Sequence, residues 1–348
     1  MYEINLQTRT LYAELLEQMQ IANATRTISS LKGSFSIKAV NGDEYVYFQH
    51  YQPGGQLVQL YVGKRCDQTE AMMREQADDK EESQEVKNNL KRLSAQVKAG
   101  LGIVTDKSMY RVIHGLADAG VFRNSGVLIG THAFQAIGVM LGRRWPADSM
   151  ATTDVDIAAE KKLSVALPSL VSDIPAALES LKMGFLPVPR LNHKEPSTTY
   201  FIRKSKLRLD VLTPKITATD APVFIGRFNC AAAPLPFLSY LVENPVQAVI
   251  ADTAPLLVSI PQPVRYAMHK LIVSQIRDVS ASAKSHKDLF QSHQLLTLLK
   301  NERPGDIQPA WDNLVGRGSK WKKRAEAGLA EMQMRFGDIR LFGQSPQN

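Results

Sequence analysis

Three aspartates with apolar neighbours are the side chains of this sequence best suited to metal chemistry. Asp154 and Asp156 stand one residue apart in TTDVDIA, and Asp210 stands in LRLDVLTP. Side chains at positions i and i+2 of a strand point to the same face, so the first two carboxylates are expected to project together. Two ionised carboxylates side by side repel each other unless a cation lies between them. Their hard oxygen atoms suit Mg²⁺, with Mn²⁺ as the alternative ion.

The D-x-D pair has a second interpretation, because an edge strand with two solvated carboxylates gives the same pattern. Asp210 favours the metal site. Leu209 and Val211 flank it, and they alternate with it as the buried residues of a central strand do. A carboxylate in such a strand normally needs a partner or a metal ion. Three aspartates on neighbouring strands therefore predict a two-metal cluster.

The dipeptide Gly130-Thr131 adds a candidate phosphate site. It follows the apolar run VLI and precedes a segment with helical spacing. Backbone N–H groups and a hydroxyl at the start of a helix are placed to bind phosphate oxygens. An ordinary N-terminal helix cap by Thr131 explains the same residues, so both interpretations stay open at this point.

The elements that must position these residues begin with an N-terminal region, residues 1–104. A helix is expected at 8–30, followed by the strand-like runs SFSIKAV, EYVYFQHY and QLVQLYVG with turn signals between them. These runs predict a small antiparallel meander. A long charged helix is expected from Asp67 to about Lys98, and Gly100 and Gly102 mark the boundary to the next region.

Residues 105–225 alternate helical and strand-like segments around the aspartates. A helix is expected from Met109 to Leu116 and another in SLVSDIPAALESLKMGF, whereas GVLIG, TTDVDIA and the hairpin TTYFIR-KSK-LRLDVLTP are expected strands. Residues 226–348 begin with PFLSYLV, VQAVI and PLLVSI, expected as short strands or a strand-rich linker, and continue with three helices. This order predicts an α+β fold with a mixed sheet and helices packed on it.

Composition and charge favour a soluble protein with an anionic partner. The 348 residues are 44% hydrophobic and 22% charged, and the formal net charge is +8. A positive balance favours nucleotides, RNA or DNA. The two cysteines fit no disulfide framework or zinc pattern, which favours a reducing compartment. The N-terminus lacks the layout of a signal peptide, and no apolar run reaches the roughly 18–20 residues that span a bilayer. We therefore expect a cytoplasmic protein without membrane contact.

The strand ending in Gly130-Thr131, the D-x-D strand and the later strand with Asp210 together resemble the nucleotidyltransferase fold of the DNA polymerase β superfamily. More narrowly, the segments LIGTHAFQAIGVMLGRRW, TTDVDIA, LRLDVLTP and PVRYAMHKLIVSQIRD…KSHKDLFQSHQLL resemble a bacterial family of nucleotidyltransferase-fold proteins. They are also similar, more distantly, to the AbiEii and MenT-type nucleotidyltransferase toxins. The resemblance covers residues 105–300 and implies a mixed-sheet core whose nucleotide pocket is completed by C-terminal helices.

The resemblance implies roles for individual residues. Gly130 and Thr131 would bind the triphosphate of an NTP such as ATP. Asp210 would complete a metal site and help to activate the attacking hydroxyl, and the two Mg²⁺ ions would be held by Asp154, Asp156 and Asp210. Two cationic helices would line the nucleotide pocket through Lys270, Arg277, Lys284, Lys287 and Asp288. The alternative for the lysines and arginine is an ordinary basic helix surface.

The implied reaction is in-line attack of an acceptor hydroxyl on the α-phosphate of an NTP, which transfers an NMP. RNA, and tRNA in particular, is the favoured acceptor; a protein side chain or a small molecule is the alternative. A toxin–antitoxin role would follow from the toxin-like relatives. Two other functions stay open: a binding or regulatory protein with a degenerate transferase fold, and a metal-dependent glycosyltransferase that uses D-x-D on a nucleotide sugar. The presence of all three aspartates weighs against degeneracy.

The stretch RRWPADSMA, residues 143–151, makes the connection between Gly130-Thr131 and Asp154 longer than in most of the superfamily. We expect a loop near the site, with Arg143 and Arg144 as candidate phosphate contacts. His132 is a candidate nucleotide contact, with capping or packing as the alternative. Trp321 lies on the apolar face of an expected C-terminal helix, so a core position is favoured over an RNA-binding surface.

Overall fold

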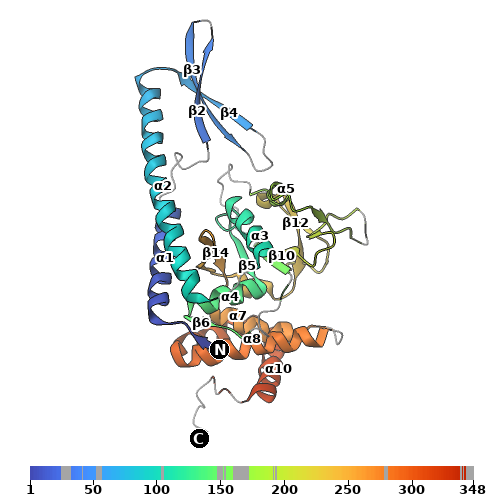
Figure 1. Ribbon diagram of the computed structural model, residues 1–348. Helices are drawn as coiled ribbons and strands as arrows, with labels where there is room; N and C mark the ends of the chain where they lie inside the picture. The colour runs from blue at the N-terminus through green and yellow to red at the C-terminus, as the bar shows by residue number, and fades with distance from the viewer. Residues whose placement is uncertain are drawn as a thin grey trace.

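A seven-stranded mixed sheet forms the centre of the computed structural model (Figure 1). The structure describes residues 1–24, 33–40, 42–51, 57–102, 106–146, 152, 154–159, 172–190, 192, 194–277, 281–337, 339 and 341. The strand order is β11-β12-β10-β7-β5, with β9 paired to β10 and β8 paired to β9. The strands are β5 (Gly126–Ile129), β7 (Asp154–Ala159), β8 (Phe185–Pro187), β9 (Thr199–Ile202), β10 (Arg208–Pro214), β11 (Val223–Ile225) and β12 (Cys230–Leu235).

The two strands that carry the aspartates, β7 and β10, are parallel neighbours in the middle of this sheet. β5 lies antiparallel to β7. β9 and β10 form the antiparallel hairpin expected for TTYFIR-KSK-LRLDVLTP, which confirms that prediction. Alternate residues of β7 and β10 are fully buried, as expected for a central pair of strands: Val155, Ile157, Leu209 and Val211 are inaccessible to solvent.

Helices cover the sheet, and the C-terminal helices form a layer below it in the view of Figure 1. A single hydrophobic cluster extends from Tyr110 to Ile339 and includes residues on both sides of residue 225. The mixed sheet with packed helices confirms the α+β fold class. The helices of this part are α3 (Lys107–Asp118), α4 (Gly130–Met140), α5 (Ile174–Ser180), α6 (Leu238–Val242), α7 (Pro263–Ser274), α8 (Ser282–Glu302), α9 (Ile307–Val315) and α10 (Ser319–Phe336).

The N-terminal region adds a helical arm and a separate small sheet. Helix α1 (Leu6–Ala24) packs on α2 (Asp67–Leu101), and their buried side chains form a second hydrophobic cluster that includes Leu15 and Val97. Gly102 ends α2 in the left-handed region, with φ of 58°. Strand β1 (Tyr2–Glu3) pairs with β6 (Arg143–Arg144).

The predicted meander is confirmed as a three-stranded antiparallel sheet of β2 (Gly33–Val40), β3 (Asp43–Tyr51) and β4 (Leu57–Lys64). It stands beyond the N-terminal end of α2, away from the C-terminal helical layer (Figure 1). Its closest helix contacts are at the start of α2, where Arg65 forms ion pairs with Glu44 and Glu70. None of the described residues of the meander belongs to either of the two hydrophobic clusters.

Two segments expected as strands do form a hairpin, β13 (Val246–Ile250) with β14 (Leu256–Ile260). The prediction for PFLSYLV was wrong, because residues 238–242 form the short helix α6. Its residues are buried on nearly all sides, and a short apolar run without periodicity fits a buried helix as well as a buried strand. α9 was not anticipated from the sequence either.

The helix expected in SLVSDIPAALESLKMGF is shorter than predicted. It covers Ile174–Ser180 with Asp173 as its N-terminal cap, and Gly184, at φ of 78°, separates it from β8. Residues 169–171 of the prediction lie outside the described residues. α1 likewise ends at Ala24, and the remainder of the expected helix at 25–30 is not among the described residues.

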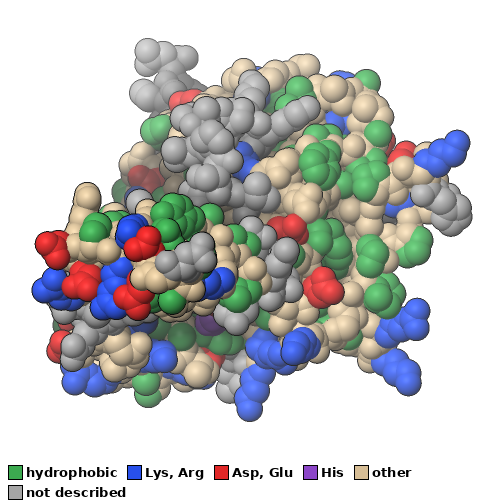
Figure 2. Space-filling model, turned by 90° about the horizontal axis from the view of Figure 1, so that it is seen from above, with side chains coloured by type: hydrophobic (Ala, Val, Ile, Leu, Met, Phe, Trp, Pro, Cys, Tyr) green, Lys and Arg blue, Asp and Glu red, His purple; other side chains and the backbone are tan. Residues whose placement is uncertain are grey.

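Trp321 on α10 is partly buried and packs edge-on against Phe237, at 4.6 Å between ring centroids, so it lies against the core at its margin and not within it. Lys and Arg side chains are scattered along the rim of the face shown in Figure 2, with acidic side chains between them on one side. On this face the described side chains do not gather into one basic patch. No helix within the described ranges is both long and apolar enough to cross a bilayer.

Candidate active site

Asp156 and Asp210 occupy paired positions of the parallel strands β7 and β10. Paired residues of neighbouring strands point to the same face, so the two carboxylates stand side by side. Asp210 is also paired with Thr199 on β9, and the Thr199 hydroxyl donates a hydrogen bond of 2.5 Å to Asp210 Oδ1. Asp154 precedes Asp156 by two residues on the same face. The two predicted segments therefore meet in the centre of the sheet.

The carboxylate of Asp156 is electrostatically unfavourable in the absence of a cation. Burial, together with the neighbouring carboxylates of Asp210 and Asp154, raises the pKa of Asp156 to about 6. Burial also raises the pKa of Asp210, although the hydrogen bond from Thr199 lowers it in part. Raised carboxyl pKa values in a polar cluster are typical of sites that bind a cation or move a proton.

Gly130 is in direct contact with this cluster. Its φ of 66° lies in the left-handed region, and a Cβ atom added at this position would come within 2.3 Å of Asp156 Oδ2. Ile129, the residue before it, pairs with Asp156 across β5 and β7. Only glycine satisfies both the backbone conformation and the close approach of the carboxylate. The turn that leads into α4 is thus built around the side chain of Asp156.

The donor set fits a Mg²⁺ ion that is shared with a substrate. Among the described residues, no three side chains of the types His, Cys, Asp and Glu are grouped so that they alone would hold a metal ion. Mg²⁺ usually takes only one or two carboxylates from the protein, together with water and substrate phosphates. Asp156 and Asp210 supply two adjacent carboxylates, and the cluster of all three aspartates stays a prediction.

Thr131 contributes its hydroxyl to a cationic side chain instead of capping α4. Lys287 Nζ on α8 donates to Thr131 Oγ1 over 2.9 Å, and Thr131 is buried. The N-terminal cap position of α4 is Ile129, and no side chain accepts a capping hydrogen bond there. Burial and the nearby Lys270 ammonium lower the pKa of Lys287. The structure therefore places a lysine on the turn that the sequence predicted to bind phosphate.

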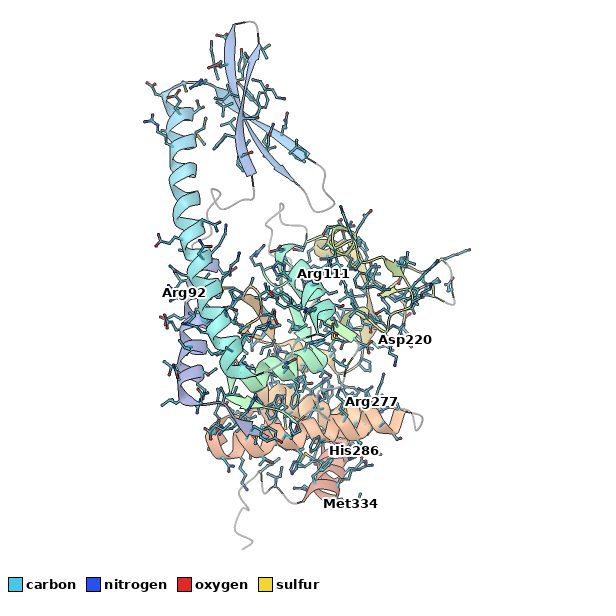
Figure 3. The ribbon with its side chains drawn as sticks, in the orientation of Figure 1. Arg92, Arg111, Asp220, Arg277, His286 and Met334 are labelled. Carbon is cyan, nitrogen blue, oxygen red and sulfur yellow. The ribbon has the colours of Figure 1, made fainter. Side chains whose placement is uncertain are left out.

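Two of the five residues predicted to line the nucleotide pocket, Lys270 and Arg277, converge on the carboxylate of a third, Asp288. Lys270 Nζ lies 2.5 Å from Asp288 Oδ1, and Arg277 Nε lies 2.5 Å from Asp288 Oδ2. Burial alone would raise the pKa of Asp288, but the neighbouring Lys270 and Arg277 cations outweigh burial and hold this pKa below its usual value. The Asp288 carboxylate in turn raises the pKa of Lys270. Arg277 lies where the helical layer meets the sheet (Figure 3).

Lys284 lies apart from this group, exposed on the first turns of α8. Its positive charge nevertheless lowers the pKa of both Asp156 and Asp210. The carboxylate pair is therefore bordered by cations on the side of α7 and α8. Such an arrangement provides positive charge for phosphates next to carboxylates for a metal ion.

Two functional contacts were missed from the sequence. Tyr266 on α7 places its hydroxyl 3.0 Å from the Gly130 carbonyl and 3.0 Å from Gln291 Oε1, so it ties the turn to both helices. No pattern in the sequence singles out this tyrosine. Thr199 was detectable, because counting back through the hairpin from Asp210 brings it opposite the aspartate.

The prediction for Arg143 and Arg144 is corrected by the structure. Arg143 forms ion pairs with Glu3 at 2.9 Å and with Glu302 at 2.6 Å, and Arg144 Nη1 donates to the Leu101 carbonyl. Both arginines thus attach the N-terminal arm to the core, because β6 pairs with β1. Residues 147–151 of the insert lie outside the described residues.

The sequence profile of a nucleotidyltransferase family matches residues 107–316, well over half of the chain. The chain belongs to this nucleotidyltransferase family. The matched region of the nucleotidyltransferase includes every residue of the candidate site, from Gly130 to Gln291. The match leaves out α1, α2, the meander and α10.

Among solved structures, the nucleotidyltransferase is similar to an antigenic nucleotidyltransferase-like protein from Paracoccidioides brasiliensis. The two share 14% sequence identity with a TM-score of 0.30, over 62% of this chain and 93% of that chain. No curated protein matches the sequence. The family assignment therefore depends on the sequence profile.

Proposed function

We propose that the protein is a Mg²⁺-dependent nucleotidyltransferase that transfers an NMP from an NTP to an acceptor hydroxyl. The observation that supports this most strongly is the position of Asp156, which lies between Gly130 on one side and Asp210 on the other. This contact joins the phosphate turn and the carboxylate pair into one site. Membership of the nucleotidyltransferase family favours this function over a D-x-D glycosyltransferase.

The chain's own residues would divide the work between binding and proton transfer. Thr131 and Lys287, with the backbone N–H groups at the start of α4, would bind the triphosphate. Lys270 and Arg277, oriented by Asp288, would supply further positive charge. Asp210 would accept the proton of the acceptor hydroxyl at Oδ2, since Oδ1 accepts a hydrogen bond from Thr199. Bound Mg²⁺ would offset the negative charge of the phosphates.

RNA, with tRNA first, is the acceptor we propose, and a toxin-like modification of RNA is the corresponding biological role. The net charge of +8 supports an anionic acceptor. ATP is one of the four NTPs to be tested. An RNA acceptor would place the reaction in the cytoplasm.

The proposal is tested by incubating the protein with each α-labelled NTP, Mg²⁺, and either total RNA or a protein extract. Label should appear in RNA with the natural protein and should be lost with Asp154→Ala. Label in protein would support the proposed nucleotidyl transfer but would show that the acceptor is a protein and not RNA. Absence of label with every NTP, while NTP binding is retained, would instead support a regulatory protein with a degenerate transferase fold.

A further inference from the structure

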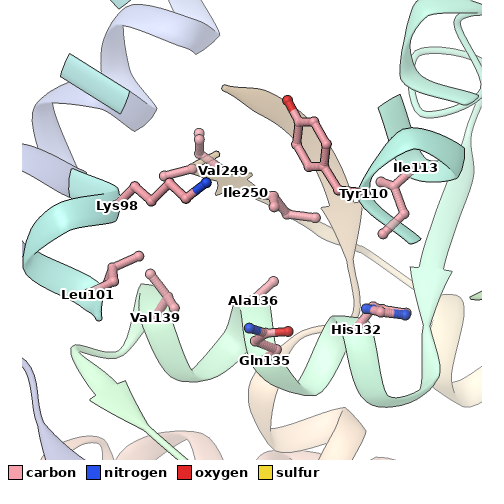
Figure 4. A pocket seen from close by; sticks show the side chains of 11 residues that line it. Lys98, Leu101, Tyr110, Ile113, His132, Gln135, Ala136, Val139, Val249 and Ile250 are labelled. Carbon is pink, nitrogen blue, oxygen red and sulfur yellow. The ribbon is translucent and has the colours of Figure 1, made fainter. Parts of the chain in front are cut away.

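A pocket lies between the N-terminal arm and the family-matched core, on the side of α4 that does not face α7 and α8 (Figure 4). It encloses about 540 Å³ of empty space, a figure that includes open solvent at its mouth. Helix α2 forms one wall, and α3, α4 and the end of β13 form the others. The side chains used below are Lys98, Tyr110, His132, Gln135 and Ala136.

The pocket is mainly apolar, and the single charge of its lining is paired with a carboxylate outside it. Leu101, Ile113 and Val139 are among its buried walls. The one charged lining residue, Lys98, is neutralised by Asp252, whose Oδ1 lies 2.7 Å from Lys98 Nζ. A phosphate or carboxylate would have to displace this partner. The lining therefore favours a neutral ligand over the triphosphate.

One buried side chain of the pocket, His132, has a ring nitrogen without a hydrogen-bond partner among the described residues. His132 is only 8% exposed, and its Nε2 forms no hydrogen bond with any of the described residues. Burial lowers the pKa of His132 to about 4, so the ring is neutral at physiological pH. A buried polar atom without a partner costs free energy, and a ligand that hydrogen-bonds to it recovers that cost.

Gln135 follows His132 by three residues, so the two polar groups lie on the same face of α4. Both are visible along the pocket wall in Figure 4. An imidazole and a carboxamide together offer hydrogen-bond donors and acceptors to the edge of a ring, and the carboxamide is a known partner for nucleobase edges. Tyr110 adds an aromatic ring to the wall, while its hydroxyl is engaged by Ala254.

We propose that this pocket binds a neutral, flat heteroaromatic ring of nucleobase size, held by apolar walls and by hydrogen bonds to His132 and Gln135. The ring belongs either to a free nucleoside or to the base of the NTP itself. His132 directly follows Thr131, whose hydroxyl binds Lys287. Ligand in the pocket would therefore contact the helix that begins at the phosphate turn.

Binding is tested with the full chain and four neutral probes, adenosine, guanosine, cytidine and uridine, by saturation-transfer NMR and calorimetry. At least one probe should bind the natural protein. Ala136→Leu fills the pocket and should abolish binding, whereas Ala71→Leu on the exposed surface of α2 should leave it unchanged. Gln135→Met keeps the volume and removes the carboxamide, so affinity should fall about tenfold. Unfolding curves establish that each variant folds.

Competition with NTPs separates the two sources of the ring. If an NTP displaces the nucleoside, the pocket receives the NTP's own base; if both bind together, the nucleoside is a separate ligand. The inference is overturned if none of the four probes binds, or if Ala136→Leu binds them as well as the natural protein. Should Ala136→Leu not fold, unchanged affinity in Gln135→Met overturns it equally. None of these binding measurements requires catalysis. A negative result in the nucleotide-transfer assay would therefore not affect the conclusion about the pocket.

Discussion

At the scale of single residues, Asp156 is the most constrained side chain of the site. It is paired with Asp210 on β10, it lies against Gly130, and burial raises its pKa to about 6. The alternation of LRLDVLTP and TTDVDIA predicted that these strands would bring the aspartates together. The contact with Gly130 was not predictable, because it depends on how closely β5 and the turn approach β7.

Gly130→Ala should abolish transfer. The left-handed backbone costs an alanine about 1–2 kcal/mol, and the added Cβ would push the Asp156 carboxylate away. Gly184→Ala is the matched control, because φ is 78° there and nothing lies within 4 Å of the added Cβ. In urea unfolding Gly130→Ala should lose at least as much stability as Gly184→Ala, because it adds the conflict with Asp156 to the backbone cost, and only Gly130→Ala should lose NTP transfer. Equal activity of the two variants would contradict the role of this contact.

Asp156→Asn should stabilise the metal-free protein at alkaline pH. The pKa of Asp156 rises from 3.8 to about 6 on folding, so the folded state binds the proton more tightly. Protonated Asp156 therefore adds to the stability of the folded state. This contribution is fully present below pH 4 and is lost as pH rises through 6. At pH 8 the variant should gain up to about 3 kcal/mol in free energy of unfolding, at about 1.4 kcal/mol per pKa unit.

The gain in free energy of unfolding that Asp156→Asn shows at pH 8 should disappear near pH 4. Chemical unfolding at pH 8 and at pH 4 measures this difference. Asp312→Asn on the exposed face of α9 is the control, with an expected change within about 0.5 kcal/mol. The buried histidines His132 and His269 also make stability depend on pH. Both proteins contain them, so their effect cancels when the variant is compared with the natural protein. Equal stability of variant and natural protein at pH 8 would argue against the crowded carboxylates.

Thr199→Val should lower kcat about tenfold and leave the KM for NTP unchanged, because it removes one hydrogen bond to Asp210. The same hydrogen bond lowers the pKa of Asp210. Its loss should therefore move the acidic limb of the kcat profile to higher pH. Thr199→Ser keeps the hydroxyl and should restore both values; a serine variant as impaired as the valine variant would mean that packing, not the hydrogen bond, is the cause.

At the scale of elements, α7 and α8 act as a unit that supports the phosphate turn. Asp288 binds Lys270 and Arg277, Lys287 reaches Thr131, and Tyr266 contacts Gly130. The helices themselves were predictable from their apolar spacing. Their pairing was implied only by the family resemblance, since spacing within one helix says nothing about which carboxylate on the next helix lies opposite.

Asp288→Asn should destabilise the protein by about 3–5 kcal/mol, because it leaves the Lys270 ammonium buried without its partner. Adding Lys270→Met should recover much of this loss, since the unpaired charge is then removed. Glu326→Gln, which breaks an exposed pair with Lys322 at 3.9 Å, is the control and should cost less than about 1 kcal/mol. Urea unfolding measures five proteins: the natural protein, Asp288→Asn, Lys270→Met, the double variant and the Glu326→Gln control. Additive effects of the two core changes would contradict the coupling.

At the scale of the whole molecule, sequence patterns specified the elements better than their packing. Alternation and turn signals predicted the meander and the hairpin of β9 and β10, and charged composition predicted the long helix α2. Short apolar runs such as PFLSYLV were ambiguous because their burial on all sides removes the periodicity that separates helix from strand. The role of Arg143 was misassigned because its partners, Glu3 and Glu302, are distant in sequence.

The arrangement of the whole chain also explains where the pocket lies. The family-matched region contains the sheet and the candidate site, whereas α2 comes from outside it and closes one wall of the pocket. The chain has a net charge of +8, and on the face shown in Figure 2 the Lys and Arg side chains are scattered along the rim. The binding of an acceptor is therefore expected to depend on salt over a broad surface rather than on one patch.

The central claim is that this site transfers the nucleotidyl group and not the terminal phosphate. The most direct measurement compares α-labelled and γ-labelled NTP with the same RNA acceptor and Mg²⁺. The account predicts that the α-label becomes attached to RNA, that the γ-label is released as pyrophosphate, and that Asp154→Ala stops both. Attachment of the γ-label, or unchanged α-labelling by Asp154→Ala, would contradict it.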